Sequence, residues 1–158
     1  MKLPPLGSDP MDTFSKPLKS KKTKLATLFY FNPRKIPEKP GRSLSVIWDK
    51  RCPFVDGYEN NYQYIVNFDK SGEKAGGHYH HDKQELFIPI VGQIKVVLED
   101  ITTKEKEEII LDSRDQSVLY IKPPLAHVVI SQTELCSILV IATYPNNLMD
   151  EFPYQINP

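Results

Sequence analysis

The spacing of its short apolar runs limits the possible folds of this chain more than any other feature. These runs return about every 8 to 12 residues between charged or turn-forming segments, and hardly any stretch shows helical periodicity. The segment Tyr62–Phe68 alternates strictly, so its even-numbered residues share one face of an extended strand. Further strands are expected at residues 25–31, 43–49, 86–91, 93–99, 108–111, 118–122, 128–130 and 136–143. This pattern predicts an all-β protein with an antiparallel jelly-roll barrel.

The length of 158 residues suits one folded domain. We expect that domain to cover residues 25–158. Residues 1–24 mix proline, serine and lysine without a period, and their lysines crowd between Lys16 and Lys24. This composition predicts a flexible basic N-terminal arm.

Charge and composition exclude several classes of partner. Twenty basic and twenty acidic residues cancel, so no overall field favours nucleic acid. No apolar stretch reaches the roughly 20 residues of a membrane span, and the start of the chain lacks the apolar core of a secretory signal. Cys52 and Cys136 form no close pair, which fits a reducing compartment. We therefore expect a cytoplasmic protein with a small-molecule partner, and neither nucleic acid nor a membrane.

The densest chemistry lies between Gly72 and Gly92. In an extended segment His78 and His80 project to one side, whereas His81 projects to the other. Glu85 follows a polar turn and can supply an oxygen to the same point. Imidazole nitrogens with a carboxylate suit a divalent transition metal such as Zn, Mn, Fe or Ni.

The spacing of Gly72, His78, His80, Glu85 and Gly92 resembles the first motif of the cupin superfamily at every fixed position. The segment 120–127 resembles the second motif, which ends in one histidine, although Ser117 and Leu125 stand where the family usually has glycines. The resemblance implies a double-stranded β-helix. It also implies a metal site formed by His78, His80, Glu85 and His127.

A narrower resemblance covers about residues 26 to 150. The run Gly76–Glu85, together with residues 97–100, 111–115 and 118–121, resembles the WxcM-like sugar 3,4-ketoisomerases and the cupin domains of capsular polysaccharide biosynthesis. Those enzymes are jelly-roll dimers that move a keto group between carbons 4 and 3 of a dTDP-linked deoxyhexose. The resemblance implies a homodimeric sugar-nucleotide isomerase or epimerase, paired through residues 25–49, in polysaccharide or glycan biosynthesis.

Two residues depart from that group. Ala75 stands where the group carries an arginine that helps to hold the substrate, and Glu85 stands where it tends to have glutamine and works without a metal. Whether Ala75 abolishes turnover of nucleotide sugars stays open.

The resemblance and the residues suggest roles at the site. We expect His78 or His80 to act as a base and Tyr64 as an acid beside a carbonyl. A bound metal would instead polarise the carbonyl and occupy the same imidazoles. For the pyrophosphate of a nucleotide sugar the candidates are Lys70, Lys74 and Arg114. Two alternatives are a metal-dependent cupin dioxygenase and a non-catalytic sugar-binding cupin.

Overall fold

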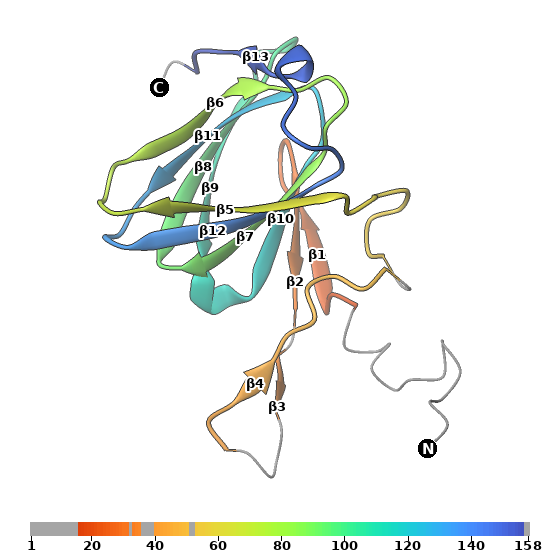
Figure 1. The fold of residues 1–158 in the computed structure, drawn as a ribbon, viewed down its shortest axis with the longest axis vertical. Coiled ribbons are helices and arrows are strands. Elements are labelled where there is room, and N and C mark those ends of the chain that lie inside the picture. Colours follow the sequence, from red (N-terminus) through yellow and green to blue (C-terminus); the bar gives the residue numbers. More distant parts are fainter. Residues whose placement is uncertain (1–15, 32, 36–39, 51–52, 157–158) are drawn as a thin grey trace.

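Two antiparallel sheets face each other and form a jelly-roll barrel in the computed structural model (Figure 1), which confirms the predicted fold. The structure describes residues 16–31, 33–35, 40–50 and 53–156. One sheet has the strand order β1-β2-β10-β7-β12-β5, and the other has the order β13-β6-β11-β8-β9. A small two-stranded sheet, β3-β4, stands apart from the barrel (Figure 1).

The bounds of the strands follow the apolar runs of the sequence. They are β1 (Lys19–Lys22), β2 (Thr27–Tyr30), β3 (Arg34–Lys35), β4 (Ser43–Leu44), β5 (Tyr62–Phe68), β6 (Lys74–Tyr79), β7 (Glu85–Val91), β8 (Gln93–Asp100), β9 (Lys106–Asp112), β10 (Ser117–Ile121), β11 (Leu125–Ser131), β12 (Cys136–Ala142) and β13 (Phe152–Pro153). Two short 3-10 helices, η2 (Ser113–Asp115) and η3 (Leu148–Asp150), connect them.

The N-terminal third differs from the sequence-based prediction in two places. Lys19–Lys22, inside the segment expected to be an arm, forms β1 and pairs with β2. All four of its side chains are exposed, so the strand is held by its backbone and leaves no apolar pattern. The strand expected at residues 43–49 is limited to β4. Residues 1–15 of the expected arm lie outside the described residues.

The main core fills the space between the two sheets. It is built from aliphatic and aromatic side chains of both inner faces, among them Phe87, Leu98 and Leu119. A second cluster, around Leu86 and Ile88, covers the outer face of the larger sheet and packs against Trp48 and other aromatic rings. Strand β7 is therefore buried on both faces, which explains why its sequence does not alternate.

Two strands show how local sequence sets the barrel. The predicted alternation of β5 is confirmed, because its side chains switch regularly between half-buried and exposed. Pro89 was expected at an edge or a bulge because it has no amide hydrogen. It lies in the central strand β7, opposite the place where the register with β12 shifts between Ser137 and Ile138. None of the helices described in the structure is of a length and apolarity that could span a bilayer.

Candidate functional site

Three imidazoles meet at the end of the barrel where β6 finishes. Strand β11 runs antiparallel to β6 and sets His127 opposite His78, and His80 follows β6 directly. The ring centroids of His78 and His127 lie 4.7 Å apart, and those of His78 and His80 lie 4.8 Å apart. One ring nitrogen of each of the three histidines lies within 4.8 Å of the others. The parity predicted for His78 and His80 therefore places them as expected.

The glycine before this histidine run allows the close approach of the two strands. Gly76 has a φ of +89°, and a Cβ on it would lie 2.7 Å from the carbonyl oxygen of His127. A side chain at this position would meet both a disfavoured backbone conformation and a backbone clash. The register between β6 and β11 shifts at the same point, between His127 and Val128. Gly76 thus lets His127 reach the end of β6.

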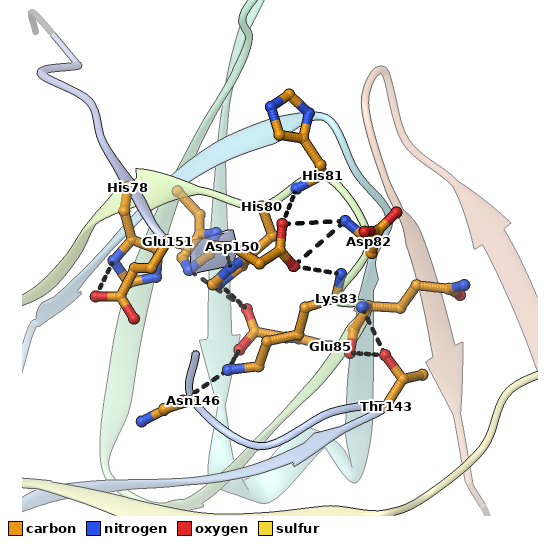
Figure 2. A network of polar contacts seen from close by, with 12 residues as sticks. His78, His80, His81, Asp82, Lys83, Glu85, Thr143, Asn146, Asp150 and Glu151 are labelled. Atoms are coloured by element: carbon orange, nitrogen blue, oxygen red, sulfur yellow. Dashed lines mark hydrogen bonds and ion pairs between the residues drawn. The ribbon is translucent and has the colours of Figure 1, made fainter. Parts of the chain in front are cut away.

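Glu85, the first residue of β7, lies at the centre of the site and is 1% exposed. Its Oε1 accepts a hydrogen bond from the hydroxyl of Tyr64 at 3.0 Å and lies 3.3 Å from the Nζ of Lys83. Its Oε2 lies 3.4 Å from Nε2 of His127 and 4.0 Å from Nε2 of His80. The carboxylate therefore links the histidines to a lysine and a tyrosine (Figure 2).

Burial and charge set the ionisation of this cluster. Burial raises the pKa of Glu85, but His127, Lys83 and His80 outweigh it, and the pKa lies below the usual value. Burial also lowers the pKa of His127, so its ring is neutral near pH 7. Burial and the two neighbouring histidines lower the pKa of His78 to about 4. Because these two rings are neutral, Lys83 is the cation that keeps Glu85 ionised.

Tyr64 keeps its proton at neutral pH. Burial and the nearby Glu85 carboxylate raise the pKa of its hydroxyl well above the usual value. The hydroxyl therefore donates to Glu85 and holds the carboxylate in one orientation. Tyr64 reaches the cluster from β5 in the opposite sheet, as the sequence suggested.

The segment after β12, residues 144–154, crosses this end of the barrel (Figure 1), and we call it the C-terminal strap. Its β13 pairs with β6. The Asp150 carboxylate accepts hydrogen bonds from the backbone amides of His81, at 2.7 Å, Asp82, at 3.3 Å, and Lys83, at 3.1 Å. The strap therefore fixes the turn that carries the site residues (Figure 2).

The strap also fixes the tautomer of His80. The Nδ1 atom of His80 is hydrogen-bonded to the backbone carbonyl oxygen of Asp150. A carbonyl oxygen can only accept, so Nδ1 carries the hydrogen and Nε2 carries the lone pair. Nε2 is the atom that points toward Glu85. His80 thus presents an acceptor or ligand atom to the centre of the site.

Three buried polar atoms at this centre have no hydrogen-bond partner among the described residues. They are Nε2 of His80, Oε2 of Glu85 and Nδ1 of His127. Buried polar atoms are nearly always satisfied, and an exception calls for a ligand, an ion or a catalytic role. Two imidazole nitrogens and a carboxylate oxygen form a donor set that fits a divalent transition metal.

A pocket of about 550 Å³ opens beside this cluster. Its walls come from the turn after β6 and from the C-terminal strap, and they consist of His80, Asp82, Lys83, Tyr144, Pro145, Asn147 and Asp150. A volume of this size accommodates a small organic ligand. His80 and Lys83 are therefore the residues that connect the buried cluster to a bound molecule.

Lys83 is the site residue that the sequence did not indicate. Its side chain is buried, and its Nζ donates to Oδ1 of Asn146 at 2.7 Å. A lysine in a polar turn resembles a solvated surface residue, and its burial depends on the strap packing over it. Asp150 was missed for the same reason, because its contacts join positions far apart in the sequence.

The other predicted site residues lie elsewhere. The His81 side chain points away from the cluster (Figure 2) and contacts Phe152 and Tyr79. Lys70 follows β5 at the barrel end opposite to His78, and Lys74 begins β6, four residues before His78. Arg114 lies in η2, beside the β7-β8 turn, and forms an ion pair with Asp112 at 2.7 Å. The structure does not bring these three cations to the histidines.

Comparison with known proteins places this site in a family context. A family model described as FdtA: WxcM-like, C-terminal, matches residues 26–152. No curated protein matches the chain.

Solved structures share the fold. The 3,4-ketoisomerase QdtA from Thermoanaerobacterium thermosaccharolyticum, in complex with TDP, is 22% identical with a TM-score of 0.67, covering 83% of this chain and 89% of that chain. A 3,4-ketoisomerase from Helicobacter canadensis is 20% identical with a TM-score of 0.67, covering 80% and 89%. The dTDP-4-dehydrorhamnose 3,5-epimerase from Bacillus anthracis, with TDP and PPi bound, is 13% identical with a TM-score of 0.72, covering 84% and 81%.

Proposed function

The chain belongs to the FdtA family, the WxcM-like C-terminal domains, and from that premise we propose that it is a cupin isomerase or epimerase acting on a nucleotide-activated keto-deoxy sugar. The observation that carries the proposal is His80, whose Nε2 lone pair is held toward the site while its ring lines a pocket of about 550 Å³. The ketoisomerases and epimerases that share the fold are described as bound to TDP or to a TDP-linked sugar.

The proposed reaction begins with loss of a proton beside the carbonyl. Nε2 of His80 takes the hydrogen as a proton, the pair of the C–H bond forms a carbon–carbon double bond, and the carbonyl π pair moves to oxygen. Return of the proton to the same carbon on the other face gives an epimer. A 3,4-keto shift results when the proton instead returns to the former carbonyl carbon, while the neighbouring hydroxyl loses its proton and becomes the ketone.

The remaining residues prepare this step. His78, neutral because its pKa is lowered to about 4, is a second acceptor beside the substrate. Tyr64 retains its proton and holds the Glu85 carboxylate, which in turn faces Nε2 of His80 and of His127. A carboxylate at this place stabilises the imidazolium that forms when His80 accepts a proton.

The test is hydrogen exchange with solvent. Given a dTDP-4-keto-6-deoxyhexose in heavy water, the protein should introduce deuterium at the carbon next to the carbonyl, whichever product is released. His80→Ala removes the base and should abolish the exchange. Absence of exchange by the wild-type protein with several nucleotide-linked keto sugars would contradict the proposal and favour an oxygenase or a sugar-binding module.

We propose in addition that the site binds a divalent transition metal, Zn, Mn, Fe or Ni. The atoms that support this are the unpartnered Nε2 of His80, Oε2 of Glu85 and Nδ1 of His127, with the ring of His78 adjacent. A bound ion would supply a Lewis acid for a substrate oxygen. Elemental analysis of protein purified without chelators decides the question. A metal content near zero that excess ion does not change would leave the histidines as acid and base alone.

A homodimer is the proposed assembly. The β3-β4 sheet extends away from the barrel (Figure 1), and its Leu44 is 45% exposed. The outer face of the larger sheet carries an apolar pocket of about 310 Å³, lined in part by Phe31, Ile47 and Leu139. A second copy would cover both features. Light scattering at micromolar concentration should give twice the chain mass of 18.2 kDa, and a monomer would contradict the assembly.

A further inference from the structure

One lysine lies inside the barrel mouth. Among the residues that the structure describes, Lys83 is the buried member of the lysines and arginines, with 4% of its surface exposed. An ammonium group loses strong hydration when it is buried, so a buried lysine needs a partner or a function. Lys83 has two partners, the Oε1 of Glu85 at 3.3 Å and the Oδ1 of Asn146 at 2.7 Å.

The ammonium group retains a free donor. It carries three N–H bonds, and Glu85 and Asn146 engage two of them. The ring of Tyr64 lies beside it, with Nζ 5.4 Å from the ring centroid, and no further hydrogen-bond acceptor contacts it within the described part of the chain. Lys83 also lines the same pocket as His80. A ligand in that pocket can therefore accept the third hydrogen bond.

Lys83 and His80 lie on the two oxygens of one carboxylate. Nζ of Lys83 faces Oε1 of Glu85, whereas Nε2 of His80 faces Oε2. A base and a cation are thus held a few atoms apart beside one pocket. This arrangement suits a molecule that gives up a proton at one carbon and gains negative charge on the oxygen of the next.

We propose that Lys83 is a catalytic residue that holds the developing enolate oxygen of the substrate, an inference that rests on the proposed isomerase function. As His80 takes the proton, the C–H pair forms the carbon–carbon double bond and the carbonyl π pair moves to the oxygen. A Lys83 N–H donates a hydrogen bond to that oxygen, with no transfer of its proton. When the carbon regains a proton, the charge on the oxygen disappears. The substrate class is therefore a ketone whose carbonyl oxygen reaches Lys83 while the adjacent C–H faces His80.

A purely structural role predicts a different result. If Lys83 served only as the counter-charge of Glu85, its loss would change the stability of the protein and the binding of any ligand together. An oxyanion donor acts on the transition state, so its loss lowers the rate of exchange and leaves ground-state binding in place.

The test uses Lys83→Met in the full chain, with dTDP-4-keto-6-deoxyglucose as substrate in heavy water and dTDP as the binding probe. We expect exchange to fall about 100-fold or more, as for other single oxyanion donors, with a dTDP dissociation constant within a few-fold of wild type. The matched control is Lys95→Met, because Lys95 also lies 3.3 Å from a glutamate, Glu108, yet does not line this pocket. The control should exchange at the wild-type rate.

The outcomes separate the two proposals. If wild type exchanges and Lys83→Met exchanges equally fast, the role of Lys83 is wrong while the isomerase function stands. If wild type shows no exchange, both fail. Should Lys83→Met not fold, Lys83→Gln keeps an N–H donor toward Glu85 and Asn146 but has no charge. Its exchange should fall at least about tenfold, and an unchanged rate would overturn the inference.

Discussion

The ion pair between Lys83 and Glu85 makes a quantitative prediction about stability. Glu85→Gln keeps the shape of the side chain and an oxygen for the Tyr64 hydroxyl, but it removes the charge that faces Nζ at 3.3 Å. At that distance, with an effective dielectric constant of about 20, the lost attraction is about 5 kcal/mol. Measured losses for buried pairs broken on one side are about 3–5 kcal/mol. We therefore expect Glu85→Gln to lose about 3–5 kcal/mol of unfolding free energy.

The double variant tests the cause of this loss. In Lys83→Met with Glu85→Gln neither charge remains, so the penalty of an unpaired buried ammonium disappears and most of the lost stability should return. Urea unfolding of wild type, both single variants and the double variant at pH 7 gives the coupling energy directly. The slope of free energy against urea should stay constant across the four proteins.

Two results would refute this reasoning. One is a loss below about 1 kcal/mol for Glu85→Gln, because that is the range of a solvated ion pair. The other is simple additivity of the two single losses, since residues in one charged cluster should couple.

Other predictions concern the histidine cluster. Because the pKa of His78 is about 4 in the folded protein and about 6.5 when unfolded, the unfolded chain binds the extra proton between these values. Stability should then fall as pH drops from about 6.5 toward 4, by about 1–2 kcal/mol after solvent screening, and a flat melting temperature with chelator present would contradict this. Gly76→Ala should cost about 1–3 kcal/mol, because its Cβ would lie 2.7 Å from the His127 carbonyl oxygen; urea unfolding measures the loss, and an unchanged midpoint would show that β6 can shift. His81→Ala should leave deuterium exchange within about twofold of wild type, since its side chain points away from the cluster; a large loss would mean that the ring enters the site.

Parity along one strand was enough to predict the first half of the site. His78 and His80 are two residues apart, and an extended segment sends both to the same side whatever the rest of the fold does. The contribution of His127 depends on the pairing of β11 with β6 and came from resemblance alone. Tyr64 could be suggested because its strand alternates, but its bond to Glu85 depends on how the two sheets face each other.

The cations at the site could not be predicted in the same way. Lys70, Lys74 and Arg114 are no more polar than Lys83, and all four lie in or beside turns. The difference is that the C-terminal strap covers Lys83, and such contacts between distant segments leave no local pattern. The same holds for β7, whose burial on both faces removes the alternation that would otherwise reveal its inward residues.

The C-terminal strap separates the barrel from the fine adjustment of its site. The barrel strands that carry the histidines end at residue 142, whereas the carbonyl that fixes the His80 tautomer and the carboxylate that holds the 81–83 turn both belong to Asp150. A designer can therefore graft a different segment after β12 without altering any core residue of the two sheets. Such chimaeras would vary the shape of the pocket wall and the set of the catalytic ring on a constant scaffold, so this short segment is the natural place to redirect the protein toward new ketones.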